Sequence, residues 1–463
     1  MREKLASRLG FILLSAGCAI GIGNVWRFPY VCGQSGGGAF VAIYLFFLAI
    51  LGIPVLIMEF AAGRAAQRSI TVLHRELQPE RKWWSLHGIA GLAGNVLLMM
   101  FYTTVTGWMV IYFCKTALGD FAGLDPAQVG AAFGSMLGDW KLQTAAMLFV
   151  ALGSAAICAV GVQKGLERVT KGMMLMLLLL IVVLAVNSVR LPGAGKGVGF
   201  LLVPDLDRFL QVGVGTTLVN AMNQAFFTLS LGIGAMAIFG SYIGKSHTLL
   251  GEAVNVAALD TVVAMSAGLI ILPACFAYGI EAGQGPGLLF VTLPNVFNHM
   301  PLGRLWGALF FLFMCFAALS TVLAVFECII AGIVDYLELY SGLRAEKRRA
   351  VACLIVAIAI PLLSMPCLLG FNLWSGFQPF GEGSCVLDFE DFLVSDLLLP
   401  LGSLAFAVFC CHRYGWGWEK FRSEANAGRG PKLAKWLRPY CAYVLPLIIL
   451  AIFVIGLYRR FIA

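Results

Sequence analysis

Residues 17–29 interrupt an apolar segment with groups that could form a binding site. They contain three glycines together with Asn24, Arg27 and Pro29. Glycine costs about 1 kcal/mol and proline about 3 kcal/mol in the interior of a helix. Main-chain groups released from helical hydrogen bonds persist in a membrane only where protein or a water-filled cavity surrounds them. The segment therefore predicts a broken membrane helix whose free N–H and C=O groups face a small ligand or an ion.

A second interruption, Thr228–Gly234, falls inside the sixth apolar segment of the chain. If each half of the chain contains five spans, each interruption falls in the first span of its half. Paired interruptions at corresponding positions indicate the substrate site of a secondary transporter. We infer this repeat from the pattern alone, because the two halves share no evident sequence similarity.

Further polar residues lie inside apolar segments. Asp260 would cost about 2.5–3.5 kcal/mol within a span, so its carboxylate needs a partner or a cavity unless it lies near the inner interface. Ser320 and Thr321 are adjacent hydroxyls, which taken alone favour hydrogen bonds back to their own helix.

The composition requires these residues to be held in a membrane. Of the 463 residues, 60% are hydrophobic and only 12% are charged, about half the charge of a soluble domain. Apolar runs of about 20 residues, long enough to cross a bilayer, recur along the chain. We expect eleven spans, near Leu9–Val31, Ala39–Gly63, Gly88–Ala117, Leu142–Gly161, Val169–Val189, Val212–Phe239, Leu249–Ala277, Leu305–Tyr336, Ala350–Leu369, Phe392–Cys411 and Leu437–Leu457.

The basic residues predict how these spans are oriented. Most of the 32 Lys and Arg residues fall on one side if the N-terminus is cytoplasmic, as the positive-inside rule demands. We therefore expect a multi-pass protein of the plasma (inner) membrane with an extracytoplasmic C-terminus. The net charge of +8 suits an anionic inner leaflet and implies no nucleic-acid partner. The whole chain, residues 1–463, reads as one transmembrane domain, with repeats at about 9–189 and 212–411 and an extra helix at 437–457.

Several motifs together resemble the neurotransmitter:sodium symporter family. The resemblance runs through nearly the whole chain and implies an all-α, leucine-transporter-like fold with a five-plus-five inverted repeat and broken helices 1 and 6. The chain departs from the twelve spans of the leucine transporter, because only eleven are expected here. The matching segments are Gly21–Pro29, Gly36–Phe40, Gly52–Pro54, Glu59 with Gly63 and Arg64, Gln224–Gly232, Gly285–Pro294 and Asp388–Gly402.

The resemblance implies two sodium sites at the broken helices, with sodium as the coupling ion and no other cofactor. Carbonyl and short side-chain oxygens of broken helices suit a dehydrated cation. The first site would use the Ala19 carbonyl with Asn24, Thr228 and Asp260. The second would use the carbonyls of Gly17, Ile20 and Ala317 with the hydroxyls of Ser320 and Thr321.

Asp260 also bears on chloride. Most members of the family have Asn at this place, and the chloride-dependent ones have Ser four residues later, where this chain has Ala264. A methyl group does not bind chloride. We therefore expect Asp260 to supply the negative charge and transport to be independent of chloride.

The resemblance also implies a substrate site for an amino acid. Monoamine-carrying members have Asp in place of Gly21, so a ligand here should bring its own carboxylate. That carboxylate would meet the first broken helix and the Tyr102 hydroxyl. The remaining lining is apolar, which disfavours charged side chains. The residues implied to bind substrate are Ala19, Gly21, Ile22, Gly23, Leu98, Tyr102, Phe227, Thr228, Ser230, Ile233, Thr321, Ala324 and Val325.

Two gates follow from the same resemblance. Arg27 and Asp391 match the outer pair, with Phe227 and Tyr102 as an aromatic lid beneath it. Arg2 and Asp335, together with Ser241 and Tyr242, match the inner gate. Without the family pattern, Asp335 would read as an ordinary surface charge at the end of a helix.

The sequence thus predicts a sodium-coupled importer of neutral, hydrophobic or aromatic L-amino acids that works by alternating access. Its partners would be the substrate, sodium and the lipid bilayer. An amino-acid sensor or a ligand-gated channel on the same scaffold remains an alternative, as does a symporter of another zwitterion such as a betaine. No arrangement of residues indicates an enzyme.

Overall fold

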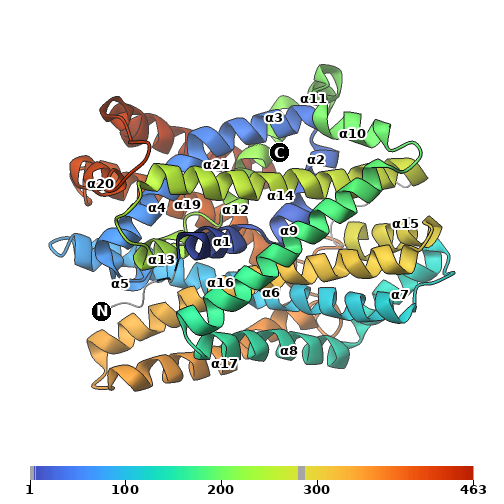
Figure 1. Cartoon of the computed structure of the whole chain (residues 1–463), viewed down its shortest axis with the longest axis horizontal. Helices are drawn as coiled ribbons and strands as arrows, with labels where there is room; N and C mark the ends of the chain where they lie inside the picture. The colour runs from blue at the N-terminus through green and yellow to red at the C-terminus, as the bar shows by residue number, and fades with distance from the viewer. Residues whose placement is uncertain (1–4, 6, 280–286, 462–463) are drawn as a thin grey trace.

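The protein is a bundle of long helices that run roughly along the horizontal axis of Figure 1. The computed structural model describes residue 5, residues 7–279 and residues 287–461. Arg2 of the expected inner gate therefore lies outside the described residues. Short helices gather at the two ends of the bundle, with α5 (Ile70–Leu77) and α20 (Trp418–Ala425) at one end and α7 (Pro126–Gly138) and α10 (Gly195–Leu202) at the other (Figure 1).

Within the described residues, nine helical stretches are long and apolar enough to cross a membrane. Several of them contain a π-helical turn that joins two α-helices without a break. The nine are Gly38–Ala66, Lys82–Leu118, Trp140–Ala159, Val162–Val189, Leu249–Tyr278, Gly303–Tyr340, Lys347–Leu369, Val386–Cys411 and Lys435–Phe461. Their main α-helices are α3 (Gly38–Phe47), α4 (Ile53–Ala66), α6 (Ser85–Leu118), α8 (Trp140–Ala159), α9 (Arg168–Val189), α14 (Leu249–Tyr278), α16 (Gly303–Tyr340), α17 (Ala345–Leu369), α18 (Val386–Asp391), α19 (Leu399–Cys411) and α21 (Leu445–Phe461).

The first expected span is broken where the glycines predict it. Helix α1 (Arg8–Ala19) ends at Ile20, whose backbone is extended, and the chain resumes as a π-turn, η1 (Gly23–Arg27), and α2 (Phe28–Gln34). The two parts are bent by 56°. Pro29 occupies the first turn of α2, where its missing N–H costs no hydrogen bond.

The sixth expected span is broken as well. Helix α12 (Val214–Thr228) and helix α13 (Ala235–Tyr242) are separated by Leu229–Gly234. Gly232 and Gly234 have φ values of +94° and +72°, a region that glycine enters at little cost. Ser230 has φ +50°, a conformation that non-glycine residues seldom adopt and that clusters at functional sites.

The expected count of eleven spans is not confirmed, although the all-helical membrane fold is. Nine stretches and the bent pair formed by α1 and η1–α2 pass the test of length and hydropathy in the described part of the chain. The sixth segment does not, because its break leaves two helices that are each short. The sequence also missed the short helices between spans, namely α5, α7, α10, α20, α11 (Leu206–Val212) and α15 (Leu293–His299).

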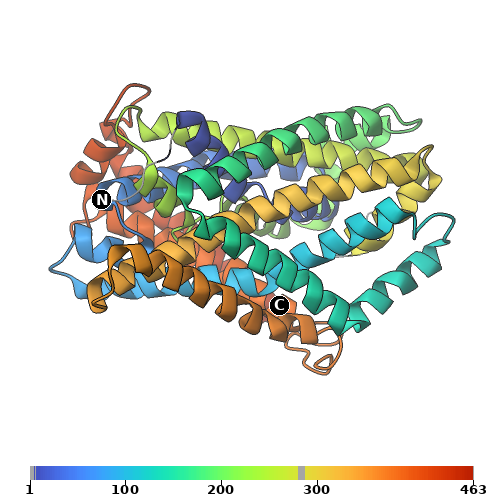
Figure 2. The ribbon, with the colours of Figure 1, turned by 60° about the horizontal axis from the view of Figure 1, so that its bottom comes forward.

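Helix α16 lies at the centre of the bundle. In its most apolar window 78% of the residues are buried, against 28% for the window of Lys435–Phe461. It packs against α6 and α9, and α1 packs against it (Figure 2). The broken segments are thus enclosed by protein, which is the condition for non-helical backbone inside a membrane.

Candidate functional site

Side chains from neighbouring helices satisfy the polar main chain of the first break. The N–H of Ile22 donates to the Tyr102 hydroxyl at 2.8 Å, and the N–H of Gly21 donates to Oδ1 of Asn24 at 3.2 Å. Tyr102 is almost fully buried on α6. Because a buried unpaired N–H costs about 1–3 kcal/mol, these contacts stabilise the open backbone at this place.

The second break is held by three side chains, of which Glu59 and Asn95 are buried and His87 is partly buried. Gly232 donates its N–H to Oε1 of Glu59 at 2.5 Å, and its carbonyl lies 3.3 Å from Nε2 of His87. The carbonyl of Ile233 accepts from Nδ2 of Asn95 at 2.9 Å. His87 and Asn95 were not expected from the sequence. Asn95 was detectable as a polar residue within an apolar run, whereas His87 stands at the edge of one.

His74 supports His87 from α5. Its Nε2 lies 3.0 Å from Nδ1 of His87, so one ring donates and the other accepts. Burial and the neighbouring His87 hold the pKa of His74 well below its usual value of about 6.5. The His74 ring is therefore neutral at pH 7, which leaves it able to exchange a single hydrogen bond with His87.

Asp260 lies between the two breaks, in a cluster of neutral donors. Its Oδ1 accepts from Nδ2 of Asn24 at 2.8 Å, and its Oδ2 accepts from the Thr228 hydroxyl at 2.8 Å. All three side chains are fully buried, and within the described residues Asp260 makes no ion pair. The Asp260 carboxylate therefore does not reach the surface of the protein. The cluster joins η1, α12 and α14 around one carboxylate.

Ser320 and Thr321 face the end of α1. Thr321 Oγ1 lies 3.3 Å from the carbonyl oxygens of both Gly17 and Ile20, and Ser320 Oγ lies 3.4 Å from the Ile20 oxygen. Ser320 also donates to the carbonyl of Ala317, within its own helix, at 2.9 Å. Ser320 therefore keeps a hydrogen bond to its own helix while both hydroxyls also lie near the carbonyl oxygens at the end of α1. Five oxygens from two helices meet here.

A small enclosed cavity of about 20 Å³ lies beside these clusters. Its size is that of roughly one water molecule. Most of the residues implied to bind substrate line it. Cys18, Val394 and Leu399 also line it, although they were not expected from the sequence. The lining is Cys18, Ala19, Gly21, Gly23, Leu98, Tyr102, Phe227, Ser230, Ile233, Thr321, Val394 and Leu399.

Four of the residues implied to bind substrate lie outside this lining. Ile22 donates its N–H to Tyr102, and Thr228 donates to Asp260. Ala324 and Val325 are fully buried within α16.

The glycines of the first break leave no room for a side chain. A Cβ atom on Gly21 would lie 2.2 Å from the Tyr102 hydroxyl and 2.5 Å from Thr321 Oγ1. A Cβ atom on Gly23 would lie 2.4 Å from the Phe227 ring. An aspartate in place of Gly21 is therefore excluded by space as well as by charge.

A larger cavity of about 440 Å³ lies above the small one, and Gly23, Tyr102 and Phe227 line both. Phe227 and Tyr102 therefore lie where the two cavities meet. Arg27 lies over the Phe227 ring, 4.6 Å from its centre, and 3.9 Å from Oδ1 of Asp391. Ser395 bridges the pair, since its hydroxyl accepts from Arg27 at 3.1 Å and donates to Asp391 at 2.6 Å. We call this larger cavity the vestibule.

Asp335 is buried rather than exposed at a helix end, because α16 continues past it to Tyr340. It lies 3.5 Å from Arg68 and accepts from the Ser69 N–H at 2.6 Å. The ordinary surface-charge interpretation is therefore excluded.

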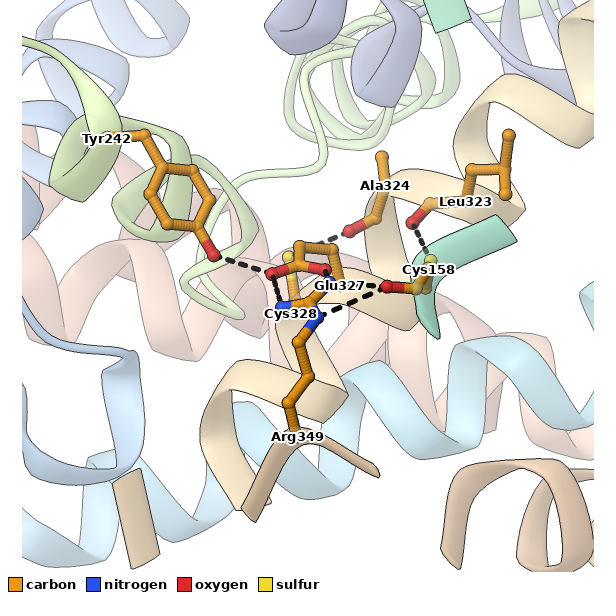
Figure 3. Close-up of polar contacts among 7 residues, drawn as sticks. All are labelled: Cys158, Tyr242, Leu323, Ala324, Glu327, Cys328 and Arg349. Atoms are coloured by element: carbon orange, nitrogen blue, oxygen red, sulfur yellow. Dashed lines mark hydrogen bonds and ion pairs between the residues drawn. The ribbon is translucent and has the colours of Figure 1, made fainter. Parts of the chain in front are cut away.

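Tyr242 contributes to a second polar cluster near α13 (Figure 3). Its hydroxyl donates to Oε1 of Glu327 at 2.7 Å, and Arg349 forms a bidentate pair with the same carboxylate at 3.1 and 2.7 Å. Arg349 also donates to the carbonyl of Cys158 at 2.7 Å. The cluster ties together α13, α16, α17 and α8. The adjacent Ser241 instead donates to Ile238 within its own helix.

The chain matches known proteins over nearly its full length. A sequence model of the sodium:neurotransmitter symporter family matches residues 2–122 and 130–460. The uncharacterized sodium-dependent transporter YhdH of Bacillus subtilis (strain 168) is 38% identical over 406 residues, covering 87% of this chain and 86% of that protein. An uncharacterized sodium-dependent transporter of Haemophilus influenzae is 30% identical, covering 99% of this chain and 98% of that protein.

The fold has a solved counterpart. The crystal structure of MhsT in complex with L-phenylalanine matches with a TM-score of 0.85 and 35% sequence identity, covering 98% of this chain and 100% of that chain. The chain therefore belongs to the sodium:neurotransmitter symporter family and is a sodium-coupled membrane transporter of a small molecule, not an enzyme.

Proposed function

We propose that this transporter imports neutral, hydrophobic L-amino acids together with sodium and without chloride. The observation that carries the proposal is the Asp260 carboxylate, which is fully buried between the two broken helices among neutral partners only. A buried charge is strongly unfavourable unless a counter-charge meets it. A sodium ion at this place supplies that counter-charge.

The Asp260 cluster contains the oxygens that such an ion needs. Asp260 and Thr228 offer a carboxylate and a hydroxyl, and the Ala19 carbonyl completes the expected set. Asn24 now points its amide nitrogen at Asp260. For Asn24 to act as a ligand, its amide must turn to present Oδ1, which releases the Gly21 N–H that Oδ1 now accepts. Sodium binding would thereby free a main-chain donor for the substrate carboxylate.

The second ion would bind where Ser320 and Thr321 meet the end of α1. The carbonyls of Gly17, Ile20 and Ala317 lie within 3.5 Å of these hydroxyls. Carbonyl and hydroxyl oxygens without a formal charge suit a monovalent cation. This ion would link α1 to α16 and so respond to movement of the first broken helix.

The cavity chemistry supports a neutral zwitterion as the substrate. Among the described residues, no charged side chain lines the small cavity, so a substrate with an ionic side chain would leave its charge unpaired. The main-chain donors near Gly21 suit a carboxylate. Apolar Leu98, Ile233 and Val394 suit a hydrophobic side chain, and the related MhsT is solved with L-phenylalanine. The small cavity must widen to admit such a side chain, and its lid residue Phe227 is only half-buried.

We further propose that the vestibule faces the outside of the plasma membrane. Arg460, near the end of α21, pairs with Asp396 at 2.6 Å, and both line a cavity that also contains Arg27 and Asp391. The C-terminal end of α21 thus lies on the vestibule side. This arrangement agrees with the distribution of Lys and Arg, which predicts a cytoplasmic N-terminus. The two halves, about 9–189 and 212–411, would form the inverted repeat.

A binding screen tests the proposal. The purified transporter would be probed with each of the twenty amino acids in sodium, in potassium and in sodium gluconate without chloride. We expect saturable binding of branched, sulfur-containing or aromatic amino acids in both sodium media and none in potassium. Binding of only acidic or basic amino acids would contradict the substrate assignment, and a requirement for chloride would contradict the role of Asp260.

A further inference from the structure

Helix α18 separates the vestibule from another cavity. One face of this short helix lines the vestibule and the opposite face lines a cavity of about 610 Å³, which we call the rear cavity. Vestibule-lining residues from this stretch are Leu387, Asp388 and Asp391, and rear-cavity residues are Val386, Phe389, Glu390 and Leu393. The same helix therefore carries the outer-gate residue Asp391 on one face and the wall of a second cavity on the other.

The rear cavity has the size and the walls of a ligand pocket. Its volume falls within the range of about 300–1,000 Å³ that small-molecule sites occupy. The other walls come from α6, α17 and the loop that follows α17, and all of them are apolar. Leu373, Trp374 and Phe377 of that loop are 70%, 49% and 49% exposed, so the cavity is bordered by large apolar side chains that are open to the surroundings.

Glu390 is the one ionisable side chain in this wall. It is 3% exposed, and within the described residues no cationic side chain pairs with its carboxylate. The Cys367 thiol lies beside the carboxylate within hydrogen-bonding reach, and the Thr104 hydroxyl lies next to that thiol. A buried carboxylate that meets only a weak thiol donor costs several kcal/mol, which a bound cation would offset.

We propose that the rear cavity binds a hydrophobic monoammonium compound of the arylalkylamine class, with its ammonium on Glu390. The apolar walls would hold the aryl and alkyl part. An amino acid is disfavoured, because its own carboxylate would stand next to Glu390. A phospholipid with an amine headgroup is disfavoured for the same reason, because its phosphate lies close to its ammonium. The ligand is therefore a cation that carries no anionic group.

An occupied rear cavity would act on the outer gate. Asp391 follows Glu390 directly, and Asp391 and Ser395 hold Arg27 over the vestibule. A ligand that fixes α18 in this position stabilises the closed contact. The structure therefore predicts that the bound ligand slows substrate turnover and leaves the apparent substrate affinity unchanged. This effect on turnover rests on the proposed function, whereas binding of the ligand itself does not.

Binding of 4-phenylbutylamine to the purified full-length transporter tests the proposal, with 4-phenylbutan-1-ol as the uncharged control. We expect the amine to bind at least tenfold more tightly than the alcohol. Glu390→Gln should remove this difference, whereas Asp388→Asn on the vestibule face of α18 should preserve it. Equal binding of amine and alcohol to the unmodified protein, or an unchanged preference in Glu390→Gln, would overturn the proposal.

Gly376→Trp tests the location independently of charge. Gly376 lines the rear cavity, and a Cβ atom there meets nothing within 4 Å, so a large side chain can enter without displacing the backbone. We expect Gly376→Trp to weaken binding of both the amine and the alcohol at least fivefold. Unchanged binding of both would place them elsewhere, including the vestibule. These experiments measure ligand binding alone, so their outcome does not depend on whether the protein transports amino acids.

Discussion

Among single residues, Asp260 is the one on which the proposed sodium coupling depends most. Its carboxylate accepts hydrogen bonds from Asn24 and Thr228 and, in the described part of the chain, has no cationic side chain as a partner. An amide at this position keeps the size but removes the charge. We therefore expect Asp260→Asn to weaken the sodium dependence of substrate binding at least tenfold, equivalent to about 1.4 kcal/mol.

The measurement is substrate binding at a series of sodium concentrations with the total ionic strength held constant. Thr261→Val is the matched control, because Thr261 is the next residue on α14 and its hydroxyl donates to the carbonyl of Ala257 in its own helix. Both variants should give well-folded protein. If Asp260→Asn needs the same sodium concentration for half-maximal substrate binding as the unmodified protein, the charge of Asp260 does not hold the ion.

Gly21 gives a second prediction at this scale. The space for its Cβ is already occupied by the Tyr102 hydroxyl and Thr321 Oγ1, so Gly21→Ala must displace one of them. We expect the Michaelis constant for the amino acid to rise at least tenfold. Gly33→Ala, in α2, is the control, because nothing lies within 4 Å of its added Cβ. Similar uptake kinetics in the two variants would show that contact at Gly21 is not needed.

Sequence reasoning located most of the polar residues of the site and few of the apolar ones. Asn24 and Asp260 were visible because a polar side chain inside an apolar span is costly and therefore conspicuous. Val394 and Leu399 line the cavity but have no such signal, since they differ in no way from the apolar residues around them. Cys18 has the character of a small hydrophobe and gives no signal of its own in the sequence, yet its position beside the first break places it in the cavity wall.

At the scale of elements, the broken helices are the decisive feature. Their positions followed from glycine, whose backbone cost is local and can be read from the chain. The side chains that hold the second break open could not be predicted in the same way. Glu59, His87 and Asn95 come from segments that are distant in the sequence. The expected count of eleven spans is likewise not confirmed at the sixth segment, because the predicted break leaves no single helix there that is long enough to count as a span.

Asn95 tests this view of the second break. Its amide donates to the carbonyls of Ile233 and Gly91, and it is fully buried. Asn95→Leu would leave the Ile233 carbonyl unpaired in a buried site, at a cost of about 1–3 kcal/mol. We expect this variant to unfold at a lower temperature than the unmodified protein in the same detergent.

Thr144→Val is the control for that measurement, because the Thr144 hydroxyl is exposed and bonds within its own helix to Trp140. It should leave the unfolding temperature nearly unchanged. An Asn95→Leu protein as stable as Thr144→Val would mean that the second break is held open without this hydrogen bond.

In the molecule as a whole, the two broken helices connect the expected sodium sites to the substrate cavity, so that binding of the ions and of the substrate is expected to be coupled. Asp260 touches η1 and α12, and the pair Ser320 and Thr321 touches the end of α1. Ions at these places would bias the same helices that line the substrate cavity. A ligand shifts a conformational equilibrium only by its difference in affinity for the two states, so coupling requires both ions to favour one orientation of the cavity.

Accumulation in proteoliposomes tests this claim most directly. With a tenfold inward sodium gradient and the membrane potential held at zero, each coupled ion supplies about 1.4 kcal/mol. Two coupled ions therefore predict about 100-fold accumulation of a hydrophobic amino acid, unchanged when gluconate replaces chloride, and no accumulation without the gradient. Equilibration of the amino acid without accumulation would indicate a channel, binding without any uptake would indicate a sensor, and either result would contradict sodium-coupled transport.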